Sequence, residues 1–171
     1  MKKACAMLCL LLGASLSFAQ DTPHIARWQS MAGVITSQGV DNPVSQNIHS
    51  GTFAWTVRKG FASVNLETGY TFFEVEGLVI NGTMFSGTPG PVPAVTGTLV
   101  CNAGTNNEVA SDTRSVNLNA QGDARFSGHL ANIPDTCSNP LFLLRIARLA
   151  PGADGRWIAT GTERWIDSQR Y

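Results

Sequence analysis

Apolar and polar residues alternate over several short stretches of the chain. In residues 61–66, Ala62, Val64 and Leu66 are apolar and the residues between them are polar. A repeat of two is typical of a β-strand with one buried face, because successive side chains point to opposite sides. We therefore expect a half-buried strand over residues 61–66, followed by a turn at 67–69.

Residues 71–79 alternate in the same way. Phe73, Val75 and Val79 fall on one face of the expected strand and are apolar. The opposite face, which we expect to meet water, carries Phe72, Glu74 and Glu76. Phe72 is the best candidate for an exposed aromatic contact residue, because alternation separates it from Phe73. We take Phe72, Glu74 and Glu76 as a possible contact surface.

Two turns are indicated by residues that tolerate positive backbone φ angles. Asn81-Gly82 follows the second expected strand and is typical of a tight hairpin turn. Gln121-Gly122-Asp123 separates two alternating stretches, residues 115–120 and 124–130. We predict that these two stretches pair with each other as a β-hairpin.

Further strands are expected at residues 141–144, which are continuously apolar, and at 156–160. Residues 87–93 contain three prolines and two glycines and predict a loop between two halves. Short strands joined by Gly, Pro, Asn and Asp turns are typical of all-β folds. We predict an antiparallel β-sandwich, with a small closed β-barrel as the alternative that pattern alone does not separate.

The first nineteen residues have the pattern of a secretory signal peptide. Lys2 and Lys3 precede an apolar run over residues 4–16, and Ser17 and Ala19 are small residues at the −3 and −1 positions of a cleavage site. The run is shorter than the roughly 20 residues that a membrane-spanning helix needs. We expect an exported bacterial protein, periplasmic or extracellular, with no transmembrane span in the mature chain.

Cleavage after Ala19 divides the chain and changes its charge. The expected parts are a signal peptide at 1–19, a flexible N-terminal segment at 20–30 and a single β domain at 31–171. Cleavage removes two of the 12 basic residues and none of the 12 acidic ones, which leaves a net charge of about −2. The remaining basic residues are dispersed, whereas nucleic-acid binding needs a basic face, so we expect no nucleic-acid partner.

Cleavage also leaves two of the four cysteines, Cys101 and Cys137. In an oxidising compartment such a pair forms a disulfide, and only one connectivity is possible. The bond would close a loop of about 35 residues and contribute about 3.5–4 kcal/mol in the chain-entropy model. A zinc site is disfavoured, because neither cysteine has a Cys or His ligand close by in the sequence.

The sequence predicts no catalytic, cofactor or metal site. His24, His49 and His129 lie far apart and are expected at the surface, and no Gly-x-Ser-x-Gly motif marks a nucleophile. Glu74 and Glu76 would lie about 6.5–7 Å apart on one strand face, a separation that glycosidase carboxylates can have. A hydrated pair is favoured, because acid–base catalysis needs one pKa raised by burial.

Aromatic residues are the remaining candidates for a carbohydrate- or protein-contact patch. We expect most of them in the core; the candidates are Trp28, Trp55, Trp157, Trp165, Phe72, Phe73 and Phe85. Residues 60–66, followed by 75–78, resemble the opening strands of chordin-type (CHRD) β domains. The His-x-His-x-Gly segment associated with that family is absent, so the resemblance implies no site and no activity here.

Together these features predict a non-catalytic binding or structural protein of the periplasm or cell envelope. Its partner is an unidentified protein, glycan or small molecule, and no cofactor is expected. The alternative is a small-ligand-binding barrel, or an enzyme whose site is assembled from distant loops. A deep pocket lined by Trp or Phe would favour that alternative.

Overall fold

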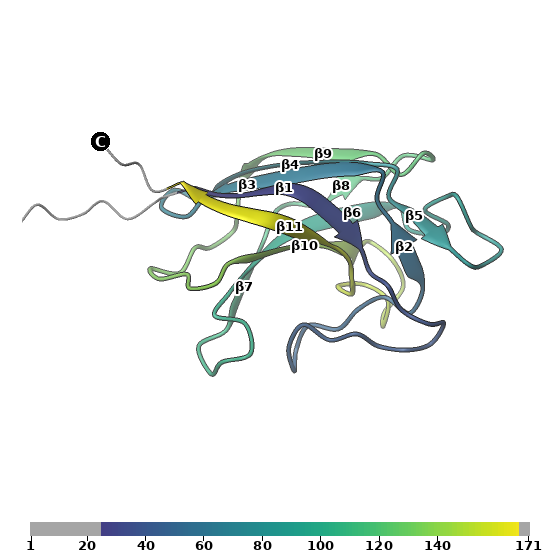
Figure 1. The fold of residues 1–171 in the computed structure, drawn as a ribbon, viewed down its shortest axis with the longest axis horizontal. Helices are drawn as coiled ribbons and strands as arrows, with labels where there is room; N and C mark the ends of the chain where they lie inside the picture. Colours follow the sequence, from purple (N-terminus) through teal and green to yellow (C-terminus); the bar gives the residue numbers. More distant parts are fainter. Residues whose placement is uncertain (1–24, 168–171) are drawn as a thin grey trace, which may run out of the picture.

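The computed structural model describes residues 25–167, which form eleven β-strands and no helix (Figure 1). The first six strands are β1 (Ile25–Gly33), β2 (Ala54–Thr56), β3 (Lys59–Asn65), β4 (Tyr70–Glu76), β5 (Val79–Asn81) and β6 (Ala94–Cys101). The other five are β7 (Val109–Asp112), β8 (Val116–Asn117), β9 (Ala124–His129), β10 (Leu141–Ala147) and β11 (Trp157–Asp167). The predicted all-β fold is confirmed. The predicted signal peptide, residues 1–19, lies outside the described residues.

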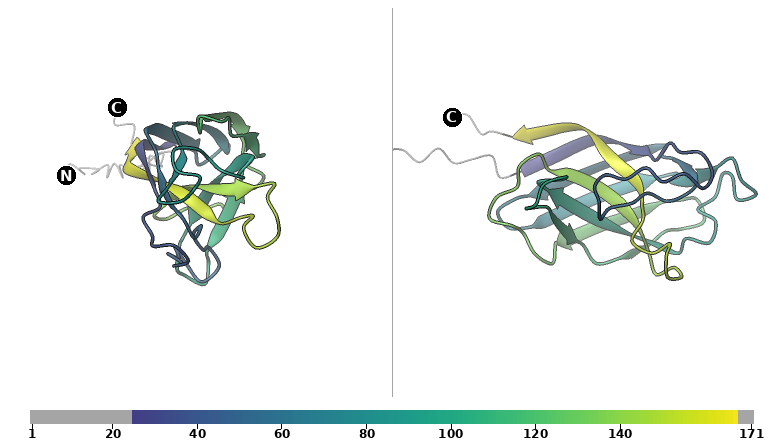
Figure 2. Two further views of the ribbon diagram at one scale, coloured as in Figure 1. Left: turned by 90° about the vertical axis from the view of Figure 1, so that its right-hand side faces the viewer. Right: turned by 90° about the horizontal axis from the view of Figure 1, so that it is seen from below.

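Nine strands form one antiparallel sheet that curls around the core. Their order is β7-β6-β10-β11-β1-β3-β4-β9, and β8 pairs with β6 next to β7. Figure 2 shows how far the sheet bends: the layers expected of a sandwich belong to one continuous sheet. The architecture therefore lies between the predicted sandwich and the small-barrel alternative. The two short strands β2 and β5 form a separate sheet at one end (Figure 1).

The two edges of the large sheet face each other along a seam. β7 and β8 make one edge, and β9 makes the other. The Ala131 N–H, just beyond β9, donates to the Asp112 carbonyl of β7 at 3.0 Å. Between residues 109–118 and 124–131, all of them described, this is the one backbone hydrogen bond that joins the edges. The seam is therefore closed at one point and open along the rest of its length.

Large aromatic side chains fill the interior of the curled sheet. Trp28 and Phe73 each pack against Phe142, with ring centroids 5.5 and 5.7 Å apart, and all three are buried. Gly97 of β6 leaves room for these rings, because a β-carbon there would lie 2.7 Å from Phe73 and 2.8 Å from Phe142. The part of the curled sheet that contains β6 can approach the part that contains β4 this closely only because residue 97 has no side chain.

The prediction of a flexible segment at residues 20–30 is wrong for residues 25–30. These residues belong to β1, which pairs with β11 on one side and β3 on the other. Ala26 and Trp28 alternate with exposed Arg27 and are buried. Residues 25–30 are ordered because β1 lies in the centre of the sheet, where both edges of the strand have partners.

The stretches 115–120 and 124–130, predicted to pair as a hairpin, diverge instead. A turn joins them, with the Asn119 N–H donating to the Asp123 carbonyl. Beyond the turn, β8 pairs with β6 and β9 pairs with β4. Each of the two strands pairs with a strand that is longer than the other member of the predicted hairpin. The turn at Asn81-Gly82 is likewise wider than predicted, because Ile80 hydrogen-bonds to residues 87 and 88.

The predicted disulfide joins Cys101 to Cys137, whose α-carbons are 4.8 Å apart. It connects the last residue of β6 to the loop that leads into β10. The next residue, Asn102, donates its N–H to the Ser138 carbonyl at 3.0 Å. The disulfide and this hydrogen bond fix the start of β10 beside the end of β6, where the two strands begin to pair.

Candidate binding face

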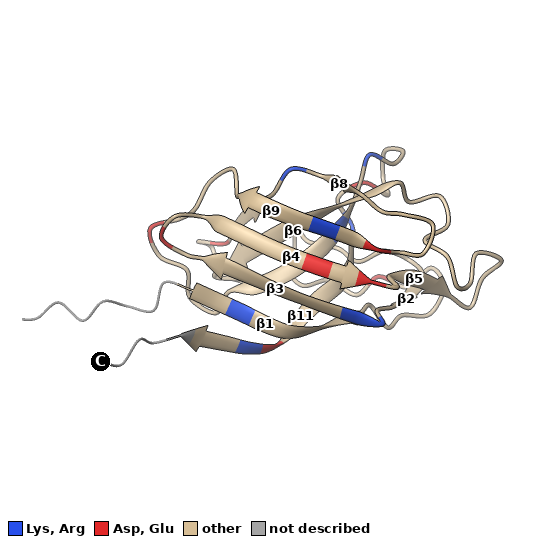
Figure 3. Cartoon of the chain, turned by 90° about the horizontal axis from the view of Figure 1, so that it is seen from above, with Lys and Arg blue, Asp and Glu red and all other residues tan. Residues whose placement is uncertain are grey.

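The outer face of β4 carries the three residues predicted as a contact surface. Phe72, Glu74 and Glu76 are partly exposed and alternate with the buried Phe73 and Val75. Their neighbours on this side of the sheet come from β3 and β9, which flank β4. Charged positions are few along these strands (Figure 3). Alternation thus places all three residues on the outside, as expected.

Phe72 is part of an aromatic cluster. Its ring stacks on that of Phe61 from β3, with centroids 5.1 Å apart and planes 24° apart. On its other side, the guanidinium carbon of Arg125 from β9 lies 4.9 Å from the Phe72 centroid. A guanidinium above an aromatic face is attracted by the negative charge density of the ring. The three side chains therefore hold one another in a defined arrangement on the outside of the sheet.

A second group extends the cluster toward the end of β4. The Tyr70 hydroxyl and the Ser127 hydroxyl are hydrogen-bonded at 2.7 Å. The Tyr70 ring meets His129 edge-on, with centroids 5.5 Å apart, and Tyr70 is 47% exposed. We call these side chains together the binding face; they are Phe61, Tyr70, Phe72, Arg125, Ser127 and His129.

The two glutamates border the binding face and have basic neighbours. Glu76 forms an ion pair with Arg58 at 3.1 Å. Glu74 lies opposite Arg125 in the register of β4 and β9. Both glutamates are partly exposed, so they remain accessible to water. This environment is that of a solvated rim.

Of the four tryptophans considered as contact residues, one is exposed. Trp28, Trp55 and Trp157 are buried, whereas Trp165 of β11 is 65% exposed. Trp165 lies opposite Arg27 of β1, and Arg27 lies opposite Ser63 of β3. Because Ser63 in turn faces Phe72, one cross-strand row leads from Trp165 to the binding face.

The two described histidines, His49 and His129, have separate environments. His24 lies outside the described residues. His49 is hydrogen-bonded through Nδ1 to the Asp41 carboxylate, and the Ser50 N–H donates to the same carboxylate at 2.9 Å. The hydrogen bond from His49, followed by that from Ser50, holds the pKa of Asp41 below its usual value. The Ser50 hydroxyl contacts Asp41 and Gly51, so these residues brace the loop between β1 and β2.

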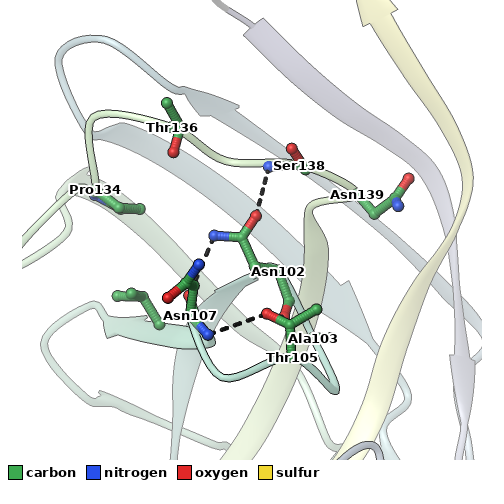
Figure 4. Close-up of a pocket in the computed structure, with 9 residues that line it drawn as sticks. Asn102, Ala103, Thr105, Asn107, Pro134, Thr136, Ser138 and Asn139 are labelled. Atoms are coloured by element: carbon green, nitrogen blue, oxygen red, sulfur yellow. Dashed lines mark hydrogen bonds between the residues drawn. The ribbon is translucent and has the colours of Figure 1, made fainter.

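A hollow of about 640 Å³ is lined mainly by residues with polar side chains (Figure 4). Its lining residues Asn102, Thr136 and Ser138 adjoin the disulfide cysteines in the sequence. Asn102 spans the hollow: its amide nitrogen donates to the Asn107 carbonyl, and its amide oxygen accepts the Ser138 N–H at 3.1 Å. The Asn107 N–H donates to the Thr105 hydroxyl. The amide of Asn102 thus connects the two loops that form the walls of the hollow, and its hydrogen bonds are used within the protein.

Sequence reasoning missed Phe61 and Arg125. Phe61 occupies the same face as Ser63 in the alternation of residues 61–66, so its exposure could have been read from the pattern. The position of Arg125 over Phe72 could not have been predicted from the pattern, because it depends on the pairing of β9 with β4. The hairpin prediction would have put β9 next to β8 instead.

Comparison with protein-family models, with curated proteins and with solved structures found no match. The likeness of residues 60–66 and 75–78 to chordin-type domains therefore remains a likeness of strand patterns. Among residues 25–167, no three His, Cys, Asp or Glu side chains lie close enough to hold a metal ion. The same residues contain no helix long and apolar enough to cross a membrane. Fold and surface define the class: an all-β domain built on one curled antiparallel sheet.

Proposed function

We propose that this protein is an exported, non-catalytic binding domain of the periplasm or cell envelope, and that it docks a protein partner through the binding face. One observation carries the proposal. Phe61 and Phe72 are stacked on the outer side of the sheet, and Arg125 lies over the Phe72 ring. The outer side of an antiparallel sheet is ordinarily polar. An aromatic cluster in this position therefore favours contact with another molecule.

The composition of the cluster favours a protein partner. Aromatic and arginine side chains provide most of the binding energy at protein interfaces, where a polar rim surrounds them. Here the rim carries the hydroxyls of Tyr70 and Ser127 and the carboxylate of Glu74. Charges of both signs beside apolar rings suit the mixed surface of another protein.

The proposed compartment rests on two features of the chain. The first nineteen residues have the pattern of a signal peptide. The Cys101–Cys137 disulfide is of the kind that persists outside the reducing cytosol. Both features favour a function in the periplasm or outside the cell.

Photo-crosslinking in cells that make the protein tests the docking proposal. A photoreactive residue at Ser63 leaves Phe61, Phe72 and Arg125 intact and lies opposite Phe72 in the register. The control carries the same residue at Asp154, in the exposed loop before β11. We expect a protein adduct at position 63 and none at 154. The purified adduct partner should bind the domain saturably, and Phe72→Ala should weaken that binding about tenfold or more.

Three results would contradict the proposal. One is the absence of a protein adduct at position 63. Another is an adduct whose yield is unchanged by Phe72→Ala and by Arg125→Ala. The third is a glycan adduct in place of a protein, which would keep the binding face but replace its partner.

A further inference from the structure

An apolar pocket of about 230 Å³ lies beside β2 and β5. Figure 1 shows these two strands at one end of the molecule. Its walls come from these two strands, from the end of β10 and from the loops before β2, β6 and β11. Six of the apolar side chains that line it are Phe53, Trp55, Ile80, Val92, Ile146 and Leu149. Four of them are buried, so the pocket is continuous with the core. None of its lining residues belongs to the binding face.

One charged side chain, Arg156, reaches this pocket. Its Nε donates to the Gly152 carbonyl at 2.7 Å, and its Nη1 donates to the Ser50 carbonyl at 2.8 Å. These two bonds fix the guanidinium in place without neutralising it. Within the described part of the chain, no carboxylate oxygen lies within 4.0 Å of the Arg156 guanidinium.

The nearby acidic group is Asp41; the charge of Arg156 attracts its carboxylate, but the hydrogen bonds of that carboxylate are made to other residues. The carboxylate of Asp41 accepts the Ser50 N–H and is hydrogen-bonded to His49. Its two oxygens are therefore engaged in the loop between β1 and β2. Arg156 thus presents a positioned positive charge at an apolar pocket, with hydrogen-bonding capacity left for an anion, since a guanidinium has five N–H donors.

We infer that this pocket binds a small amphiphile with one carboxylate, whose apolar body enters the pocket while its carboxylate pairs with Arg156. The volume sets the size of the apolar body. A water-sized group occupies about 30 Å³ in a liquid, and an apolar cavity of about 150 Å³ accepts benzene in other proteins. A pocket of about 230 Å³ therefore accommodates about seven or eight methylene-sized groups. The site recognises a medium-chain or small aromatic carboxylic acid.

The chemistry of the pocket disfavours the other simple ligand classes. A cation of the same size would meet the Arg156 charge, and a hydrophilic molecule would leave its polar groups unpaired against Phe53, Trp55 and Leu149. A neutral chain would gain the apolar contacts alone. Affinity should therefore rank carboxylate above neutral above cation for one chain length.

Octanoate titration of the mature, disulfide-bonded protein tests this inference. The readouts are calorimetry and chemical shifts of the Trp55 and Ala153 amides, with octanol and octyltrimethylammonium as ligands of matched chain length. We expect saturable 1:1 binding of octanoate, with octanol weaker by about tenfold because it lacks the ionic hydrogen bonds. Equal affinity for the three ligands, or no shift at the pocket amides, would overturn the inference.

Two variants assign the binding to the pocket. Arg156→Gln should weaken octanoate about tenfold and leave octanol unchanged. The matched control is Arg148→Gln, because Arg148 is exposed, hydrogen-bonds to Asn117 and is not among the residues that line the pocket. Unchanged octanoate affinity in folded Arg156→Gln would contradict the inference. If that variant does not fold, the ranking of the three ligands on the unmodified protein still tests the inference. The binding-face proposal is unaffected by either result, because the two sites share no residue.

Discussion

Gly97 lies on β6 opposite Leu144, and the rings of Phe73 and Phe142 occupy the space into which a β-carbon would project. The two rings belong to opposite parts of the curled sheet. A small residue at this one position therefore sets how closely those parts approach each other. Glycine is needed at position 97 because a side chain would not fit there. The backbone conformation does not require it, since residue 97 lies within the regular strand β6.

We expect Gly97→Ala to lower the free energy of unfolding by about 1–3 kcal/mol through overpacking. The distances of 2.7 and 2.8 Å to Phe73 and Phe142 leave no room for the added methyl group unless a ring moves. Urea unfolding measures the change. A double-mutant cycle with Phe73→Leu provides the control, because a smaller side chain at 73 should reduce the cost of the same alanine. Equal costs in both backgrounds would contradict the explanation.

Asp123 is the second residue from which a measurable effect follows. Its carboxylate accepts the Gly77 N–H at 2.9 Å and a hydrogen bond from the Asn119 amide. The bond from Gly77, followed by that from Asn119, lowers the pKa of Asp123 from its usual value. In the unfolded chain this carboxyl takes up a proton at a higher pH than in the folded protein. Its contribution to stability is therefore present above about pH 4 and is lost as the pH falls through the folded pKa.

Acid sensitivity should reflect this difference. We expect the unmodified protein to lose more stability between pH 5 and pH 2.5 than Asp123→Asn does, because the amide does not titrate. Urea midpoints at the two pH values provide the measurement. Asp154→Asn is the control, since Asp154 is exposed in the loop before β11. A pH dependence that is identical in Asp123→Asn and the unmodified protein would be inconsistent with this role.

At the scale of elements, residues 115–130 show what alternation can and cannot predict. The pattern located both strands and the turn between them, because burial of one face depends on local sequence. It could not identify their partners. β8 and β9 separate because β6 and β4 lie on either side of the seam, and those strands are remote in sequence. Predicted neighbours are least reliable where a sheet closes on itself.

The disulfide acts on elements as well, since it joins β6 to the segment that enters β10. We expect a Cys101→Ala/Cys137→Ala variant to lose about 3.5–4 kcal/mol of unfolding free energy, because the 36-residue separation is no longer closed in the unfolded chain. Guanidinium unfolding of oxidised and variant protein measures this loss. The reduced unmodified protein serves as the control and should match the variant. A loss below about 1 kcal/mol would contradict this expectation.

For the whole molecule, sequence reasoning predicted the fold class, the disulfide and the orientation of Phe72, Glu74 and Glu76. These features depend on periodicity and on cysteine pairing. It did not predict the binding face, since that face requires Arg125 to reach across from β9. Nor did it find the pocket, which brings Trp55, Ile146 and Arg156 together from three separate stretches of chain. Surfaces assembled by distant strands follow only from strand order.

The proposed export also concerns the whole chain, and the mass of the recovered protein tests it. We expect the intact mass of protein recovered from the periplasm or medium to correspond to residues 20–171 minus two hydrogens. Reduction should restore the two hydrogens. Replacing Leu10 and Leu11 with arginine should retain the full-length chain in the cytoplasm. Recovery of an uncleaved chain with two free thiols from the periplasm would be incompatible with the proposed processing.

The seam between β7/β8 and β9 has a consequence for the behaviour of the protein at high concentration. A flat sheet of this length would expose two edge strands, each able to recruit a strand from another molecule and start aggregation. Here each edge is directed at the other, and the hydrogen bond from Ala131 to Asp112 keeps them together. Curling the sheet therefore protects the chain against intermolecular strand addition without requiring every hydrogen bond of a fully closed barrel.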